Sequence, residues 1–138
     1  MNIILSGVDG VGKNVTKLIS ARPNYNIVAA YTRNQNYEGV DLGKHAGVDS
    51  INVNITRDRK DALETSADLL LIATTSFLKD VEDDIRTGVK AGLNVLTTAE
   101  EAAYPWIIDT KLADDLHQLA IENQVSIIGL GLNPCLLY

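Results

Sequence analysis

The sequence has one cysteine, three prolines and few aromatic residues. A single thiol, Cys135, cannot form an internal disulfide, so the fold does not depend on an oxidising compartment. No apolar run approaches the roughly 18 residues that a membrane span requires. The first seven residues show neither the basic region nor the cleavage site of a secretory signal. We therefore expect a soluble, cytoplasmic protein.

An excess of positive charge is also missing, because the formal net charge is -6. Binding to nucleic acid requires a basic face, so we expect no nucleic-acid partner. The charge is unevenly placed: residues 1–33 carry four bases against Asp9 alone, and all other acidic residues lie in residues 34–138. Such asymmetry attracts a phosphorylated ligand to the N-terminal third, although four scattered bases also fit a solvated surface.

The 138 residues are 46% apolar and 22% charged, which is the composition of a globular protein. A chain of this length buries roughly 70% of the surface that it exposes when unfolded. Neither repeats nor low-complexity tracts interrupt it. We expect one compact domain over residues 1–138.

Apolar runs and helical spacings alternate along the chain. The patterns predict strands over 2–6, 27–31, 51–55, 69–73, 94–96 and 125–130, helices over 11–22, 78–91 and around 112–120, and at most one helical turn within 39–47. This alternation predicts an α/β fold with a doubly wound parallel sheet in three layers, Rossmann-like. Ligands of such sheets bind at the carboxyl ends of the strands, so the loops 7–12, 32–36, 74–77 and 97–106 and the tail 129–134 are the candidate site.

The loop Gly7-Val8-Asp9-Gly10-Val11-Gly12 stands where a dinucleotide-binding fingerprint G-x-G-x-x-G is expected. Gly7 and Gly12 fit its first and third glycines, which give a sharp turn and close helix packing. Asp9 replaces the second glycine, and its carboxylate opposes two phosphates unless it points outward or caps the following helix. We predict cofactor contacts from Gly7, Asp9, Gly10, Val11 and Gly12, or else a Rossmann-like turn that no longer binds a cofactor.

The segment after the second strand, Tyr31-Thr32-Arg33-Asn34, lacks the acidic residue that binds an adenosine ribose. Thr32 and Arg33 suit a 2′-phosphate instead, whose charge favours the guanidinium group, and this favours NADP over NAD. An ordinary loop arginine is the alternative.

Hydroxyls and carboxylates follow two later strands. Thr74, Thr75 and Ser76 either line the nicotinamide ribose or supply a helix cap through Ser76, and capping is favoured. Glu100 and Glu101 suit a cationic substrate nitrogen or simply open a helical turn. His117 is interpreted as a helix-surface residue, His45 as a loop residue without a visible partner, and Cys135 as a small apolar residue; we predict no metal site.

Three segments together resemble one family: residues 92–101, Tyr104-Pro105-Trp106, and residues 129–134. The family is that of the dihydrodipicolinate reductase-like amine dehydrogenases, a group that includes 2,4-diaminopentanoate dehydrogenase. Residues 67–78 and 39–43 look like the same family, so the resemblance covers almost the whole chain. Two positions depart from it: Asp9 replaces the middle glycine, and Cys135 stands where glycine is usual.

By this resemblance the chain is the N-terminal NAD(P)-binding domain of a two-domain reductase, whose second domain supplies most of the substrate pocket and the oligomer interface. The resemblance implies hydride transfer between NADPH and an imine or amine-bearing carbon of an amino-acid-like substrate, in a homo-oligomer. It places Gly7, Gly12, Arg33, Thr74, Thr75 and Ser76 at the cofactor; Thr98 joins them as a candidate, and Glu100, Glu101 and Asn133 are candidates at the substrate. No proton donor is identified. A non-enzymatic Rossmann-like binding module is the alternative function.

Overall fold

The computed structural model describes residues 1–131 of the chain, which form two compact units, one of residues Met1–Thr74 and one that begins at Thr75. The predictions for Asn133 and Cys135 lie outside the described residues. Within residues 1–131, no helix combines the length and the apolar character that crossing a bilayer requires.

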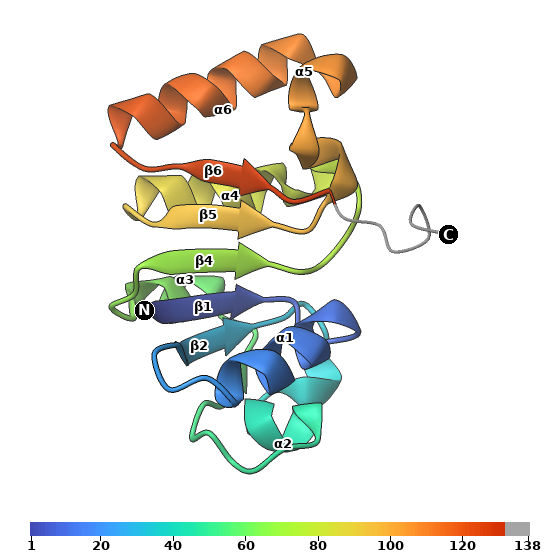
Figure 1. Cartoon of the computed structure of the whole chain (residues 1–138), viewed down its shortest axis with the longest axis vertical. Coiled ribbons are helices and arrows are strands. Elements are labelled where there is room, and N and C mark those ends of the chain that lie inside the picture. Colours follow the sequence, from blue (N-terminus) through green and yellow to red (C-terminus); the bar gives the residue numbers. More distant parts are fainter. Residues whose placement is uncertain (132–138) are drawn as a thin grey trace. The chain divides into compact units, whose positions relative to one another are not determined.

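The first unit is a parallel sheet with helices (Figure 1). Its strands lie in the order β3-β2-β1-β4, and every pairing between them is parallel. Helix α1 lies in front of these strands in Figure 1 and α3 lies behind them. The elements of this unit are β1 (Asn2–Ser6), α1 (Val11–Ser20), β2 (Asn26–Tyr31), the 3-10 helix η1 (Gln35–Tyr37), α2 (Leu42–Ala46), β3 (Ile55–Thr56), α3 (Arg59–Glu64) and β4 (Leu69–Ile72).

The core of the first unit is made by its two most apolar strands. Ile4 and Leu5 of β1 are fully buried, and so are Leu70 and Ile72 of β4. A strand that buries side chains on both faces reads as a continuous apolar run rather than an alternating one. The run of residues 69–73 predicted such a strand, and the structure confirms it.

The second unit contains two strands, β5 and β6, which pair in parallel. Helix α4 packs on β5, and α6 packs against α4. The apolar stripe predicted for α4, Leu78, Val81, Ile85 and Val89, is buried, and Gly92 follows the helix in the left-handed conformation with a φ of 79°. The elements of this unit are α4 (Leu78–Lys90), β5 (Asn94–Thr97), the 3-10 helix η2 (Glu100–Ala103), α5 (Pro105–Ile108), α6 (Thr110–Glu122) and β6 (Ile127–Gly129).

The two units together supply six strands that alternate with helices along the chain, and the strand pairings within each unit are parallel. The predicted Rossmann-like α/β class is confirmed. The five-residue helix α2 lies within residues 39–47, where at most one turn was expected, and it is slightly longer than one turn of 3.6 residues.

Two strand predictions were too long. Residues 51–55 alternate as a strand does, yet β3 covers only Ile55–Thr56, because Asn52 adopts a left-handed φ of 58° that breaks extended backbone. The last strand is limited to Ile127–Gly129. Two further helices, α3, which Asp58 caps, and α5, which begins at Pro105, were not predicted from the apolar pattern of the sequence. Helices of four to six residues are too short to show an apolar period.

Asp41 is the residue that orders the segment after η1. Its carboxylate accepts hydrogen bonds from the Lys44 N–H at 3.0 Å and the Ser50 hydroxyl at 2.9 Å, and thereby caps α2. Slight burial raises the pKa of Asp41, but the hydrogen bonds from Lys44, Ser50 and Ile51 together lower it by more. The pKa of Asp41 is therefore below its ordinary value. The capped form is therefore the ionised form.

We expect Asp41→Ala to lower the free energy of unfolding by about 1 kcal/mol, the usual loss for a helix cap. Urea denaturation measures it, with the exposed Asp49→Ala as the control that leaves stability nearly unchanged. Because the folded pKa is depressed, the contribution is complete above the unfolded pKa and is lost as the pH falls through the folded value. A difference that grows in acid would contradict this role.

Candidate functional site

The loop between β1 and α1 is built around two close backbone approaches. Gly7 has a φ of 88°, its N–H donates to the Tyr31 carbonyl at 3.0 Å, and a Cβ there would lie 2.5 Å from the Ala73 carbonyl oxygen. A Cβ at Gly12 would overlap the carbonyl of Gly7. The predicted sharp turn and close helix packing are confirmed.

The helix that follows this loop has an uncapped N-terminus. Helix α1 begins after Gly10, no side chain caps it, and its first turn carries no acidic residue. The space around Gly10 is open, since no atom lies within 4 Å of its Cβ position. The first N–H groups of a helix lack helical partners and present partial positive charge. The loop and helix therefore fit the pyrophosphate of a dinucleotide.

The Asp9 side chain is half exposed, with 56% of its surface accessible, and it does not cap α1. The cap suggested as one alternative is absent. Its carboxylate instead accepts a hydrogen bond from the Tyr37 hydroxyl in η1. That hydrogen bond, the negative charge of Asp9 and a lesser effect of burial raise the pKa of Tyr37 above its ordinary value. The acidic side chain is thus held toward η1.

His45 contacts the same loop from α2. Its side chain is 7% exposed, and its Nε2–H donates to the Val8 carbonyl at 3.0 Å. The Tyr37 ring packs on the imidazole with 4.3 Å between ring centroids, and Nε2 lies 3.7 Å from Asp9 Oδ1. The interpretation of His45 as a loop residue without a partner was wrong, because its partners are distant in sequence.

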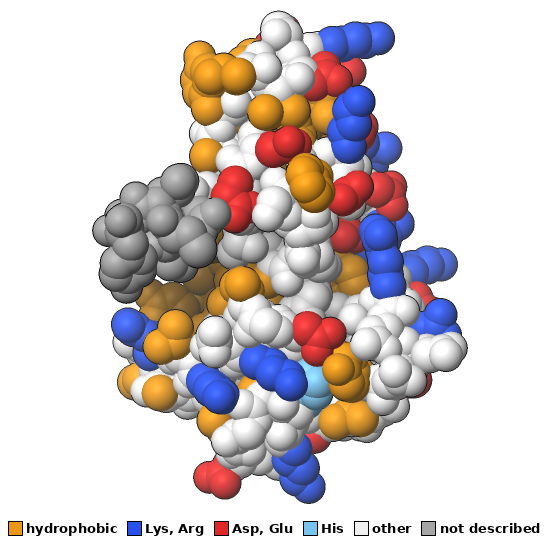
Figure 2. Space-filling model, turned by 90° about the vertical axis from the view of Figure 1, so that its right-hand side faces the viewer, with side chains coloured by type: hydrophobic (Ala, Val, Ile, Leu, Met, Phe, Trp, Pro, Cys, Tyr) orange, Lys and Arg blue, Asp and Glu red, His pale blue; other side chains and the backbone are white. Residues whose placement is uncertain are grey.

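Arg33 lies two residues past the end of β2, at the same edge as the glycine loop. Tyr31 pairs with Ser6 in the sheet, so the segments that follow, 32–34 and 7–9, leave neighbouring strands. Arg33 is exposed, and the Thr32 hydroxyl accepts a hydrogen bond from the Asn34 N–H at 3.2 Å. Acidic and basic side chains are mixed on the face drawn in Figure 2. A local basic group beside the loop, rather than a wide basic surface, is available for a phosphate.

The hydroxyl segment after β4 is divided between the two units. Thr74 belongs to the first unit, and its methyl group lies 2.7 Å from the Cβ position of Gly7. In the second unit the Thr75 hydroxyl accepts from the Phe77 N–H at 3.2 Å. The preferred capping role of Ser76 was wrong: Phe77 occupies the N-cap position of α4, and its side chain makes no cap.

The first N–H group of α4 is capped by Glu101, a carboxylate that was predicted only for a substrate nitrogen or for the start of a helical turn. Glu101 Oε2 accepts a hydrogen bond from the Leu78 N–H at 2.8 Å. The Ser76 hydroxyl hydrogen-bonds Glu100 and lowers the pKa of that carboxyl. The two carboxylates open η2, as the simpler alternative predicted, and Thr98 lies half-buried just before them. Each carboxylate has a partner within the second unit.

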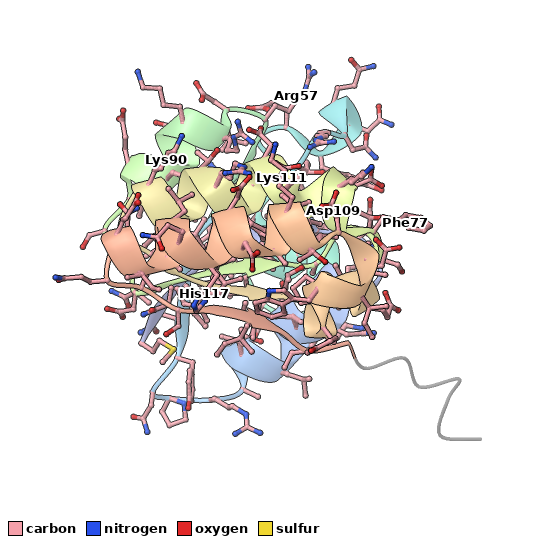
Figure 3. The ribbon with its side chains drawn as sticks, turned by 90° about the horizontal axis from the view of Figure 1, so that it is seen from above. Arg57, Phe77, Lys90, Asp109, Lys111 and His117 are labelled. Atoms are coloured by element: carbon pink, nitrogen blue, oxygen red, sulfur yellow. The ribbon has the colours of Figure 1, made fainter. Side chains whose placement is uncertain are left out.

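The second unit also contains an apolar cavity of about 470 Å³ between its helices and β6. Trp106, Leu116, Ile121 and Ile128 are among its lining residues. His117 lies exposed on α6, the helix that Asp109 caps (Figure 3), and its ring meets the Trp106 ring edge-on with 6.2 Å between centroids. Among residues 1–131, no group of three His, Cys, Asp or Glu side chains is arranged to hold a metal ion. The prediction that His117 is a helix-surface residue is confirmed.

The chain is similar to known dehydrogenases. The family described as dihydrodipicolinate reductase, N-terminus, matches residues 1–77. The 2,4-diaminopentanoate dehydrogenase of Acetoanaerobium sticklandii is 29% identical over 140 residues, covering 99% of this chain and 39% of that protein. The amine dehydrogenase of Mycobacterium smegmatis has a TM-score of 0.88 at 28% identity, covering 94% of this chain and 38% of that one.

A more distant structure, GenD2 from gentamicin A biosynthesis in complex with NAD, has a TM-score of 0.72 at 20% identity. It covers 94% of this chain and 34% of its own, and it supports the fold. The chain spans about two fifths of the length of the 2,4-diaminopentanoate dehydrogenase and of the amine dehydrogenase.

Proposed function

Because this chain belongs to the family of the dihydrodipicolinate reductase N-terminus, we propose that it is the NADP-binding domain of an oxidoreductase. The observation that carries the proposal is the β1–α1 loop, where Gly7 and Gly12 bring the backbone together beneath an uncapped helix N-terminus. Such a terminus binds a phosphate group through its free N–H groups and its dipole. The fold itself is of the NAD(P)-binding kind.

The residues divide into those for the shared part of both dinucleotides and those for the 2′-phosphate. The backbone of residues 7–12, including Val11, holds the pyrophosphate, and Arg33 binds the 2′-phosphate of NADP through charge-assisted hydrogen bonds. The bound dinucleotide supplies or accepts a hydride. Thr74, Thr75, Ser76 and Thr98 are proposed for the nicotinamide ribose, and Glu100, Glu101 and Asn133 for a cationic nitrogen of the substrate.

For the whole enzyme we propose hydride transfer between NADPH and an imine or amine-bearing carbon of an amino-acid-like substrate, in a homo-oligomer. The names of the two relatives, an amine dehydrogenase and 2,4-diaminopentanoate dehydrogenase, support this substrate class. No residue is proposed as the proton donor. The cytoplasmic location stays a prediction.

Calorimetric titration of the chain with NADPH, NADP and NAD tests the binding claim. We expect saturable binding that is tighter for NADPH than for NAD, because Arg33 has no acidic neighbour at the end of β2. The proposal would be overturned if no binding were seen at about millimolar dinucleotide, a concentration well above the usual dissociation constant of such sites.

The exposed carboxylate of Asp9 at this loop supports a second candidate, a Rossmann-like module that binds another ligand without catalysis. Such a ligand would carry a hydroxyl or cationic group where a pyrophosphate is otherwise expected. Mass spectrometry of the ligand that copurifies with the chain separates the two functions: a dinucleotide favours the first, and a small cationic or neutral molecule favours the second.

We expect the isolated 138 residues to turn over no substrate, even when they bind NADPH. Hydride transfer requires a second surface that holds the substrate within roughly 3 to 3.5 Å of the reacting carbon and excludes water. The measurement is NADPH oxidation at 340 nm with an imine substrate such as dihydrodipicolinate. A rate above the protein-free background would contradict the expectation.

A further inference from the structure

The Asp9 carboxylate presents a physical problem for the proposed function. It stands in the loop that is proposed to bind a pyrophosphate, and the two groups carry charge of the same sign. Like charges a few ångströms apart repel, and the repulsion is strongest when the carboxylate is free to turn toward the ligand. A dinucleotide therefore binds well only if the carboxylate is restrained.

The structure contains such a restraint. His45, which is nearly buried, places its Nε2 3.7 Å from Asp9 Oδ1 and donates to the preceding Val8 carbonyl at 3.0 Å. The Tyr37 hydroxyl hydrogen-bonds the same Asp9 carboxylate. The Tyr37 ring also packs on the His45 ring. Residues of two elements, Tyr37 of η1 and His45 of α2, thus hold the loop at the Asp9 side chain and at the Val8 carbonyl.

We propose that Tyr37 is a positioning residue of the phosphate-binding loop, whose hydroxyl holds the Asp9 carboxylate toward η1 so that the loop accepts an anionic pyrophosphate. The inference rests on the proposed function, because it assigns the loop an anionic ligand. The pyrophosphate is common to NAD and NADP, so the role of Tyr37 is independent of the 2′-phosphate. His45 supports the same arrangement by fixing the loop backbone beneath it.

A double-mutant cycle between the two side chains tests the inference. We expect Tyr37→Phe to weaken both NADPH and NADH about fivefold, a modest effect because the opposing charges are exposed to water and partly screened. In Asp9→Asn, which keeps an oxygen acceptor and removes the charge, the same Tyr37→Phe change should leave affinity nearly unaltered. Tyr25→Phe, at an exposed tyrosine of the same unit, is the matched control and should change neither affinity.

The hydrogen bond has a spectroscopic readout that needs no ligand. The pKa of Tyr37 is raised chiefly by Asp9, so its phenol ionises at higher pH than an ordinary tyrosine. The difference in ultraviolet titration between wild type and Tyr37→Phe isolates this phenol from the other four tyrosines. In Asp9→Asn the midpoint should move down toward the ordinary value.

The outcomes separate this inference from the proposed function. Binding that Tyr37→Phe weakens equally in the wild type and in Asp9→Asn would show a merely structural tyrosine and overturn the inference alone. The inference alone would also be overturned if Tyr37→Phe left dinucleotide affinity unchanged, or if the Tyr37 phenol of the wild type titrated like an ordinary tyrosine. A wild type that binds neither dinucleotide would overturn the proposed function and the inference together.

Discussion

Replacing Gly7 with alanine is expected to destabilise the chain by about 2 to 5 kcal/mol. A left-handed residue with a side chain costs roughly 1 to 2 kcal/mol, and forcing a methyl group into packed surroundings adds about 1 to 3 kcal/mol. Both apply, because Gly7 has a φ of 88° and its Cβ position lies 2.5 Å from the rigid carbonyl of Ala73. Urea denaturation followed by circular dichroism measures the loss.

Gly39 provides the matched control for this substitution. Its φ of 77° is also left-handed, yet no atom lies within 4 Å of its Cβ position. Gly39→Ala should therefore show only the backbone cost of about 1 to 2 kcal/mol. Equal losses in the two variants would mean that the close approach of Gly7 to Ala73 does not contribute.

Replacing Arg33 with alanine is expected to weaken NADPH about tenfold to a hundredfold and to leave NADH nearly unchanged. One or two hydrogen bonds between charged groups contribute on the order of 1.5 to 3 kcal/mol, and only NADPH carries the 2′-phosphate that receives them. Calorimetric titration of both cofactors against the wild type and the variant measures the effect.

Arg22→Ala is the control for the charge alone. Arg22 is an exposed base of the same unit, but it lies in the turn that precedes β2 rather than after its carboxyl end. Arg22→Ala should change the affinities for NADPH and NADH only by the small long-range effect of removing one positive charge. If Arg33→Ala weakened NADPH and NADH by the same factor, the assignment of Arg33 to the 2′-phosphate would be wrong.

The elements that the sequence predicted best are those with a long and consistent apolar pattern. Two elements show this: the apolar stripe of α4 from Leu78 to Val89 and the apolar run of β4. Their apolar side chains are buried, and the spacing of apolar residues along the sequence is enough to identify them. The strand predicted from the alternation of residues 51–55 is interrupted at Asn52, which has a left-handed backbone. The alternation of polar and apolar residues carries no information about that backbone conformation. Short helices such as α3 and α5 carry too few residues for any period.

The site divides in the same way between local pattern and tertiary contact. The β1–α1 loop and the close approach of Gly12 to Gly7 were predictable from the sequence, because a turn between adjacent strand and helix depends on neighbouring residues. The direction of the Asp9 carboxylate and the partner of His45 became visible in the folded chain, since Val8 lies 37 residues before His45 and Tyr37 lies 28 after Asp9. Side chains that far apart meet when η1 and α2 pack beside the loop, and no spacing in the sequence encodes that contact.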